Sequence, residues 1–447
     1  MKKTLFIAAL MSIFIGSVTA QEKFSFKFYG FVRNYACYDT RESLTSNSEQ
    51  FYYMPKNVYD PDNTGEDLNA QPNMMLLSIT TRLGLNITGP EFLGAKTSAK
   101  IEADFAGFGT SNTVLRIRQA YAKMDWKYSK VLIGQAWHPM MGDMMPDVFS
   151  LETGAPFTPF SRTPQLRYDY ANKGFTLTAT ALYQFQYTSY GPDGASFNYA
   201  RNAIVPELYF QAMYKNGGFQ AGVGIDLLTI KPRQSYSWDV TEYSPVLDAN
   251  NNPIFDAEGN PVTVGKVVSK TFKCNEAPVV SITPTLFASY KAERWGIKGR
   301  VTYAQNAAHL SMISGYGVTN INQENGEWEY GTINSIGGWI DATYKQPLKK
   351  GYLQFCCFAG YTKNLGCESN FMRDDKGGYL IFMRGEKNMD YMWRVAPSIL
   401  YTHNALQIGV EYNPTTVGYG THDGDYKMYN PRPVTNHRIC AMVKYNF

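Results

Sequence analysis

The sequence predicts an all-β protein, a transmembrane antiparallel β-barrel of about 16 strands, and three observations lead to this prediction. Stretches of alternating apolar and polar residues recur along the chain. The connections between these stretches are alternately short and long. An apolar N-terminal segment has the form of an export signal, and no later run is apolar over the roughly 18 residues that a spanning helix needs.

The N-terminus has the features of a cleavable signal peptide. Lys2 and Lys3 provide a charged start, an apolar run follows from Leu5 to Ile15, and a small-residue cleavage site ends at Ala20. The chain is therefore divided into a signal peptide, residues 1–20, and a single barrel domain, residues 21–447. No Cys follows the cleavage site, so we expect no lipid anchor there.

Alternation is clear in the last strand, which begins near Thr435. Tyr445 and Phe447 lie on one face, whereas Arg438 and Lys444 lie on the other, because successive side chains of a strand point to opposite faces. The chain ends on an aromatic residue. One face is expected to contact outer-membrane lipid and the other a water-filled lumen. A charge at lipid mid-depth costs about 2–4 kcal/mol, which explains why the charged residues keep to the opposite face.

Loop lengths indicate the orientation in the membrane. Short turns such as Lys127–Ser129 and Asn216–Gly218 alternate with long segments such as Thr40–Asn73 and Lys231–Ala277. Outer-membrane barrels have short periplasmic turns and long extracellular loops. We therefore expect both termini in the periplasm of a Gram-negative cell.

The third long connection differs from the others. Between His138 and Thr163 the alternation stops, and Met, Pro and Phe dominate. Such an apolar loop is poorly suited to water, so it is expected to fold inward against the barrel wall. Residues 139–163 are the candidate constriction loop of a channel.

Charged residues near this loop are the candidate pore-lining site. Guanidinium groups stay charged and bind carboxylate or phosphate with two hydrogen bonds, and rings of Arg and Lys favour anions in a pore. Acidic residues lie close by in sequence, so the field could be transverse, and ordinary solvated lumen charges are the alternative. The candidate residues are Arg33, Glu102, Asp104, Arg116, Arg118, His138, Arg162, Arg167 and Asp169.

Charge and motif content argue against other classes. Two of the 42 Lys and Arg residues lie in the signal peptide, and the remaining 40 nearly balance 38 Asp and Glu, which does not favour nucleic-acid binding. The five histidines show no HExxH spacing, and no GxSxG occurs, so neither an enzyme nor a cofactor or metal site is predicted. Four alternatives stay open: a surface-binding or adhesin barrel using its long loops, an outer-membrane hydrolase, Cu(I) binding by the methionines with His138, and a soluble β-sandwich. Calcium in the acidic loops, such as Asp60–Asp67, is a further possibility.

The cysteines and one outward asparagine complete the analysis. The six Cys lack the spacing of a disulfide scaffold or a zinc site, so packed free thiols are expected, with a Cys356–Cys367 disulfide as the alternative. Asn34 should face lipid beside Val32, and a subunit interface would accommodate its polar side chain.

Several short motifs resemble the DcaP-type trimeric outer-membrane porins. They are Tyr29–Arg33 with Tyr38 and Asp39, Arg116 and Arg118 with Gln119–Tyr121, Gly134–Trp137, Gln165–Tyr168, and the terminal Phe447. The resemblance implies an outer-membrane homotrimer with sixteen strands per chain that passes small anionic solutes such as dicarboxylates by passive diffusion. It also implies that Arg33, Arg116, Arg118 and Arg167 line the lumen. The run from Met140 to Pro146 departs from the family's pattern.

Overall fold

The structure is a computed structural model of the 447-residue chain. It describes residues 24–45, 51–107, 114–142, 144–149 and 153–447. The predicted signal peptide, residues 1–20, lies outside the described residues.

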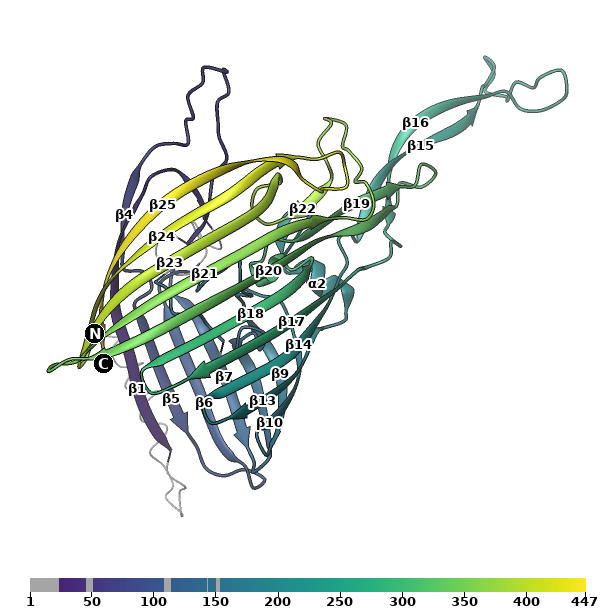
Figure 1. Ribbon diagram of the computed structural model, residues 1–447. Coiled ribbons are helices and arrows are strands. Elements are labelled where there is room, and N and C mark those ends of the chain that lie inside the picture. The colour runs from purple at the N-terminus through teal and green to yellow at the C-terminus, as the bar shows by residue number, and fades with distance from the viewer. Residues whose placement is uncertain (1–23, 46–50, 108–113, 143, 150–152) are drawn as a thin grey trace, which may run out of the picture.

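Tilted antiparallel strands close into a barrel (Figure 1). The closure joins β1 to β25 in antiparallel register from Phe31–Asn446 to Asp39–Arg438. Backbone hydrogen bonds of 3.0 Å in both directions between Gly30 and Phe447 extend it to the last residue. The wall strands are β1 (Ser25–Asp39), β4 (Asn73–Leu77), β5 (Arg82–Thr88), β6 (Lys96–Asp104), β7 (Arg116–Asp125), β8 (Ser129–Trp137), β9 (Arg162–Asn172), β10 (Phe175–Leu182), β13 (Glu207–Asn216), β14 (Phe219–Ile230), β17 (Val279–Lys291), β18 (Trp295–Gln305), β20 (Trp328–Pro347), β21 (Tyr352–Gly366), β23 (Met389–His403), β24 (Leu406–Thr421) and β25 (Tyr429–Asn446).

The predicted count of sixteen wall strands is confirmed. The hydrogen-bonded sheet has 19 segments, but β4 and β5 both pair with β1 and act as one interrupted strand. Two further segments, β19 (Gly315–Ile321) and β22 (Ile381–Met383), pair with each other, and β19 also pairs with the first part of β20. They are extensions at the loop end and are not counted as wall strands. No helix within the described ranges is long and apolar enough to span a bilayer.

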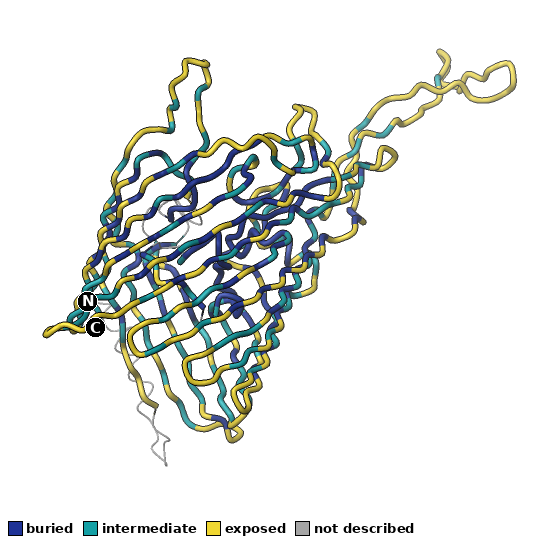
Figure 2. The backbone as a smooth tube through the Cα atoms, in the orientation of Figure 1, coloured by how far each residue is buried: buried dark blue, intermediate teal, exposed yellow. Residues whose placement is uncertain are grey.

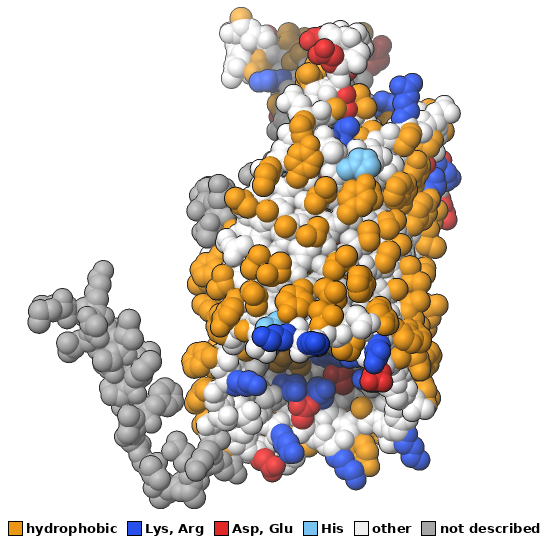
Figure 3. Space-filling model, turned by 60° about the vertical axis from the view of Figure 1, so that its left-hand side comes forward, with side chains coloured by type: hydrophobic (Ala, Val, Ile, Leu, Met, Phe, Trp, Pro, Cys, Tyr) orange, Lys and Arg blue, Asp and Glu red, His pale blue; other side chains and the backbone are white. Residues whose placement is uncertain are grey.

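The two faces of the wall differ as alternation predicts. Side chains such as Phe28, Leu177 and Val443 are exposed on the outside, whereas Asp104, Arg300 and Arg394 are buried on the inside. Hydrophobic side chains cover the outer wall between charged groups towards its two ends (Figure 3). This apolar band fits the hydrocarbon layer of a membrane, because charges on it would be costly.

Long loops extend from one end of the barrel, and short turns connect the strands at the other end (Figure 1). The longest projection is a two-stranded hairpin of β15 (Ser235–Pro245) and β16 (Thr263–Lys273), which extends far from the wall. The remaining short elements are β2 (Ser43–Thr45), β3 (Tyr52–Pro55), β11 (Ser189–Gly191), β12 (Gly194–Ser196), α2 (Asn198–Ala203) and the 3-10 helix η1 (Ala308–Leu310).

Buried residues lie inside the barrel as well as along the wall (Figure 2). The largest buried cluster joins residues from the first loop, including Tyr53 and Met54, with Phe157 of the third and Ile313 after η1. At least three loops therefore contribute to the interior of the barrel. Sequence analysis predicted inward folding only for the third and treated Thr40–Asn73 as a polar segment, although Phe51 to Met54 is apolar.

The expectation of packed free thiols is confirmed for Cys274, Cys356 and Cys367, but it was wrong for Cys37 and Cys440. Cys37 on β1 and Cys440 on β25 form a disulfide, because the closing register places them directly opposite each other. The alternative Cys356–Cys367 pairing does not occur, and both thiols are free and buried. Cys356 lies on β21 and Cys367 just beyond its end, so they are roughly 35 Å apart at about 3.3 Å per residue.

Candidate functional site

The candidate constriction loop crosses the inside of the barrel. Strand β8 ends at Trp137 and β9 begins at Arg162, so Arg162 and Thr163 belong to the wall and the loop ends earlier than predicted. Its apolar side chains contact separate parts of the wall: Met140 packs with Tyr209 on β13, Phe157 with Phe358 on β21, and Phe149 with residues of β1 and β25. The predicted inward folding is confirmed.

Glycines in the wall make room for the loop's aromatic rings. A Cβ at Gly360 would lie 2.5 Å from Cγ of Phe157, and one at Gly409 would lie 2.6 Å from Cζ of Phe149. Both distances are shorter than packing allows, so a side chain at either glycine would displace the ring. These contacts fix where the loop sits against β21 and β24.

Polar groups of the wall hold the loop backbone. Arg394 on β23 donates to the carbonyl oxygen of Ala155 (3.1 Å) and to that of Tyr53 in the first loop (2.8 Å). The amide of Asp147 donates to Asp341, and the amide of Phe149 donates to Glu411, both at 2.6 Å. Charged groups on this part of the wall are thus used to anchor loops.

The methionines of the loop have a packing role. Met140 and Met141 are fully buried, the first beside Leu182 and Tyr209, the second beside Phe160 and Tyr187. Met readily fills irregular apolar gaps, which accounts for the composition of this segment. His138 does not share these clusters and contacts carboxylates instead.

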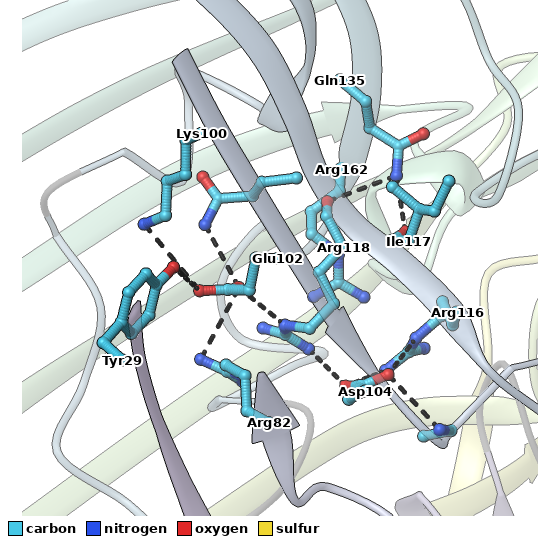
Figure 4. A network of polar contacts seen from close by, with 12 residues as sticks. Tyr29, Arg82, Lys100, Glu102, Asp104, Arg116, Ile117, Arg118, Gln135 and Arg162 are labelled. Carbon is cyan, nitrogen blue, oxygen red and sulfur yellow. Dashed lines mark hydrogen bonds and ion pairs between the residues drawn. The ribbon is translucent and has the colours of Figure 1, made fainter. Parts of the chain in front are cut away.

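A network of charged residues covers the wall formed by β1, β5, β6 and β7 (Figure 4). Arg116 forms two hydrogen bonds of 2.9 Å with Asp104, and Arg118 connects Asp104 (2.8 Å) with Glu102 (2.9 Å). Tyr29 donates to the second oxygen of Glu102 at 2.8 Å. These two carboxylates and two guanidinium groups are buried, so they form a rigid framework within the network.

Further cations surround this framework and keep partial exposure. Arg82 and Lys100 each lie 3.8 Å from Glu102, with 21% and 24% of their side chains exposed. Arg33 stacks beside Tyr35 and hydrogen-bonds Thr80, and Lys444 lies opposite it in the closing register. Both are partly exposed. The cations outnumber the carboxylates, so this wall carries a positive excess.

The other predicted pore-lining residues are distributed differently. Arg167 and Asp169 form an ion pair of 2.8 Å on β9, in which Arg167 is partly exposed and Asp169 is buried. His138 and Arg162, like Asp104, have no exposed area, so these side chains do not contact water in the lumen. The inward loop covers both His138 and Arg162. Phe160 of the loop packs beside Arg162. At the neck of the loop, where its two ends meet, the amide of His138 donates a hydrogen bond to the carbonyl oxygen of Ser161.

A second cluster of chemically reactive groups was missed by sequence analysis. Glu207 on β13, Asp226 on β14 and His309 on η1 converge on His138, and all four side chains are buried. They come from four distant parts of the chain, so no spacing in the sequence marks them. An inward-facing acid near the end of a strand was the only available signal.

A closed barrel of sixteen strands with an apolar outer band, buried lumen charges and an inward loop has the architecture of an outer-membrane β-barrel of the porin fold. The model of the DcaP outer membrane protein family matches residues 15–184, which confirms the family resemblance. No curated protein matches the chain.

Solved structures share the fold at low sequence identity. The outer membrane channel DcaP of Acinetobacter baumannii is 17% identical with a TM-score of 0.62, covering 97% of this chain and 99% of its own. An anion-selective porin from Comamonas acidovorans is 10% identical with a TM-score of 0.52, covering 95% and 100%. OmpT, an outer membrane protein of Vibrio cholerae, is 11% identical with a TM-score of 0.50, covering 97% and 100%.

Proposed function

We propose that this channel conducts small anionic solutes, of the dicarboxylate class, along the wall that carries Arg33, Arg82, Lys100 and Lys444. The observation that supports this most is the positive excess of that wall. Its two carboxylates are engaged by Arg116 and Arg118, whereas the four surrounding cations keep partial exposure. An anion that enters the lumen is attracted to cations that have no full partner in the framework.

The framework prepares this wall for anions. Burying Glu102 and Asp104 next to guanidinium groups keeps the carboxylates away from the solute and reduces their repulsion. Lys444 lies close enough to Arg33 and Arg82 for mutual repulsion, which an anion bound between them would relieve. A solute with two carboxylates can contact separate cations at once, which favours it over a monovalent anion.

The fold is compatible with this selectivity. The Comamonas acidovorans porin of the same fold is described as anion-selective. The family resemblance implies a channel rather than an enzyme, and the proposal needs no catalytic group.

The test is the reversal potential of single channels in a planar bilayer under a KCl gradient. We expect an anion preference in the native protein and a reduced preference in the Arg33→Gln, Lys444→Gln double variant. Lys376→Gln, in an exposed loop, is the matched control and should behave as the native protein. A native channel that prefers cations, or a double variant with the native preference, contradicts the proposal.

We also propose that the chain assembles as a homotrimer. Asn34 is exposed on the outer face of β1, and its side-chain oxygen accepts a hydrogen bond from Ser78, which is likewise on the outer face. Lipid offers no hydrogen-bond partner to the remaining polar atoms of this pair, whereas a subunit interface can supply one. The Asn34→Leu variant should weaken assembly in detergent-resistant gel electrophoresis, and unchanged assembly contradicts this role.

A further inference from the structure

Four side chains meet inside the barrel at the neck of the constriction loop. Nε2 of His138 lies 2.8 Å from Oε1 of Glu207 and 3.6 Å from Oδ1 of Asp226. Nε2 of His309 lies 3.2 Å from the same oxygen of Glu207 and 3.9 Å from Oδ2 of Asp226. At most 2% of any of these side chains is exposed, so water does not compensate their charges.

Hydrogen bonding indicates which form His138 takes. The backbone amide of Met140 donates to Nδ1 of His138 at 3.1 Å, so this nitrogen presents its lone pair. The ring proton then lies on Nε2 and is donated to Glu207. In this arrangement Nε2–H of His138 holds Glu207 in place.

Each of the two carboxylates keeps one oxygen atom that is not satisfied by these contacts. Oε2 of Glu207 and Oδ1 of Asp226 are buried without a hydrogen-bond partner among the described residues. Two adjacent buried carboxylates repel each other strongly unless a cation or a proton lies between them.

The geometry points to a divalent cation of the zinc type, and we propose that Glu207, Asp226 and His309 bind it. The ligand atoms of His138, Glu207 and Asp226 lie within 4.8 Å of one another, and Nε2 of His309 lies beside both carboxylates. Zinc bonds of 2.0–2.2 Å in tetrahedral geometry place neighbouring ligand atoms about 3.4 Å apart. The separations of 3.2 and 3.9 Å from His309 to the two carboxylates bracket that value.

Charge and ligand chemistry agree with this assignment. A dication neutralises the two carboxylates, and the neutral imidazole of His309 supplies the third ligand, with a water in the fourth position. His138 acts one step further out, because its Nε2–H orients Glu207 in the way that outer-shell groups commonly orient metal ligands. It is a positioning residue in this site.

Such an ion would attach the loop that follows β18 to the wall, close to the neck of the constriction loop. His138 begins the constriction loop, Glu207 and Asp226 lie on neighbouring strands β13 and β14, and His309 belongs to the loop that follows β18. The ion would thereby join β13, β14 and the loop after β18, and His138 would connect the constriction loop to the site through its hydrogen bond to Glu207. The proposal is independent of which solute crosses the channel.

Zinc content tests the proposal directly. The native barrel is stripped with a chelator during unfolding, refolded in detergent with ZnCl2, dialysed, and analysed by elemental mass spectrometry. We expect one tightly held zinc per chain in the native protein and none in the isosteric Glu207→Gln, Asp226→Asn double variant. His403→Ala, at a periplasmic turn, is the matched control and should retain the ion.

Two further measurements separate this site from adventitious binding. Competition with a chromophoric chelator should show that His138→Ala weakens zinc affinity by about 10–100-fold, as expected for loss of an outer-shell partner. Cobalt substitution should produce the visible absorption bands of a tetrahedral site in the native barrel and not in the double variant. Heat-modifiable gel migration establishes that each variant is folded. A folded native barrel that binds no more zinc than the double variant overturns the proposal.

Discussion

Cys37 on β1 and Cys440 on β25 form a disulfide across the seam where the barrel closes, linking residues 403 positions apart. The seam joins the first and last wall strands, which have no turn to hold them together. A covalent link at this place constrains the unfolded chain over nearly its whole length. It also prevents the two strands from separating as the first step of unfolding.

Replacing both cysteines by serine should therefore lower the stability of the folded barrel by about 2–4 kcal/mol. The measurement is the temperature at which heat-modifiable gel migration changes to that of the unfolded chain. Cys356→Ser, which removes a buried thiol without a disulfide, is the control for side-chain loss. An equal melting temperature for the native protein and the Cys37→Ser, Cys440→Ser variant would contradict this role of the seam disulfide.

The contact between Phe157 and Gly360 gives a test of the constriction. A leucine at position 360 cannot coexist with the ring, because even its Cβ would lie 2.5 Å from Cγ of Phe157. Gly360→Leu should displace the loop, raise single-channel conductance and cost about 1–3 kcal/mol of stability through overpacking. Ala359→Leu, on the same strand but facing outward, controls for the added bulk. Native conductance in a folded Gly360→Leu barrel would show that this loop does not limit the current.

The strands could be predicted from the sequence, whereas the seam disulfide and the contact at Gly360 could not. Alternation between lipid and lumen faces is local, so strands such as Phe175–Leu182 and the parity of Asp104 or Arg300 follow from period two alone. The seam disulfide depends on the register of β1 and β25. The contact between Phe157 and Gly360 depends on where the third loop packs against the wall. These are set by contacts between distant segments, which no local pattern contains.

The same is true of the candidate site. Sequence parity placed Arg116 and Arg118 inside the barrel, but not their pairing with Glu102 and Asp104, which turns them from free lumen charges into a framework. The partly exposed Arg82 was not among the predicted pore-lining residues.

The charge of this framework can be changed at Glu102 with little change of shape, because Gln has nearly the same size as Glu. Glu102→Gln removes a negative charge, while Arg118 keeps its 2.8 Å contact with Asp104. The wall should become more positive, and the reversal potential under a KCl gradient should move further towards that of chloride. Glu293→Gln, in the periplasmic turn between β17 and β18, is the control and should leave it unchanged. A shift towards potassium in the Glu102 variant would contradict the electrostatic argument.

The base of the projecting hairpin provides a pH-dependent contact outside the membrane. Glu276, between β16 and β17, forms an ion pair with Arg233 and accepts a hydrogen bond of 2.6 Å from Tyr330. Burial acts to raise its pKa, but the bonds from Arg233 and Tyr330 prevail and hold the pKa of Glu276 below its ordinary value of 4.5. The ionised form is thus the one that the folded loop prefers.

The sign of the pH effect follows from that shift. A carboxyl whose pKa is depressed in the folded state contributes stability above its unfolded pKa and loses it as pH falls through the folded pKa. Hydrogen exchange at the base of β15 and β16 should therefore be slow at pH 6 and increase, after correction for intrinsic rates, as pH falls below 4.5. Glu276→Gln should show the faster exchange already at pH 6, whereas Glu258→Gln, at the exposed tip, should match the native hairpin. Protection that is equal in the native and Glu276→Gln barrels at pH 6 would mean that the ion pair with Arg233 does not hold the hairpin.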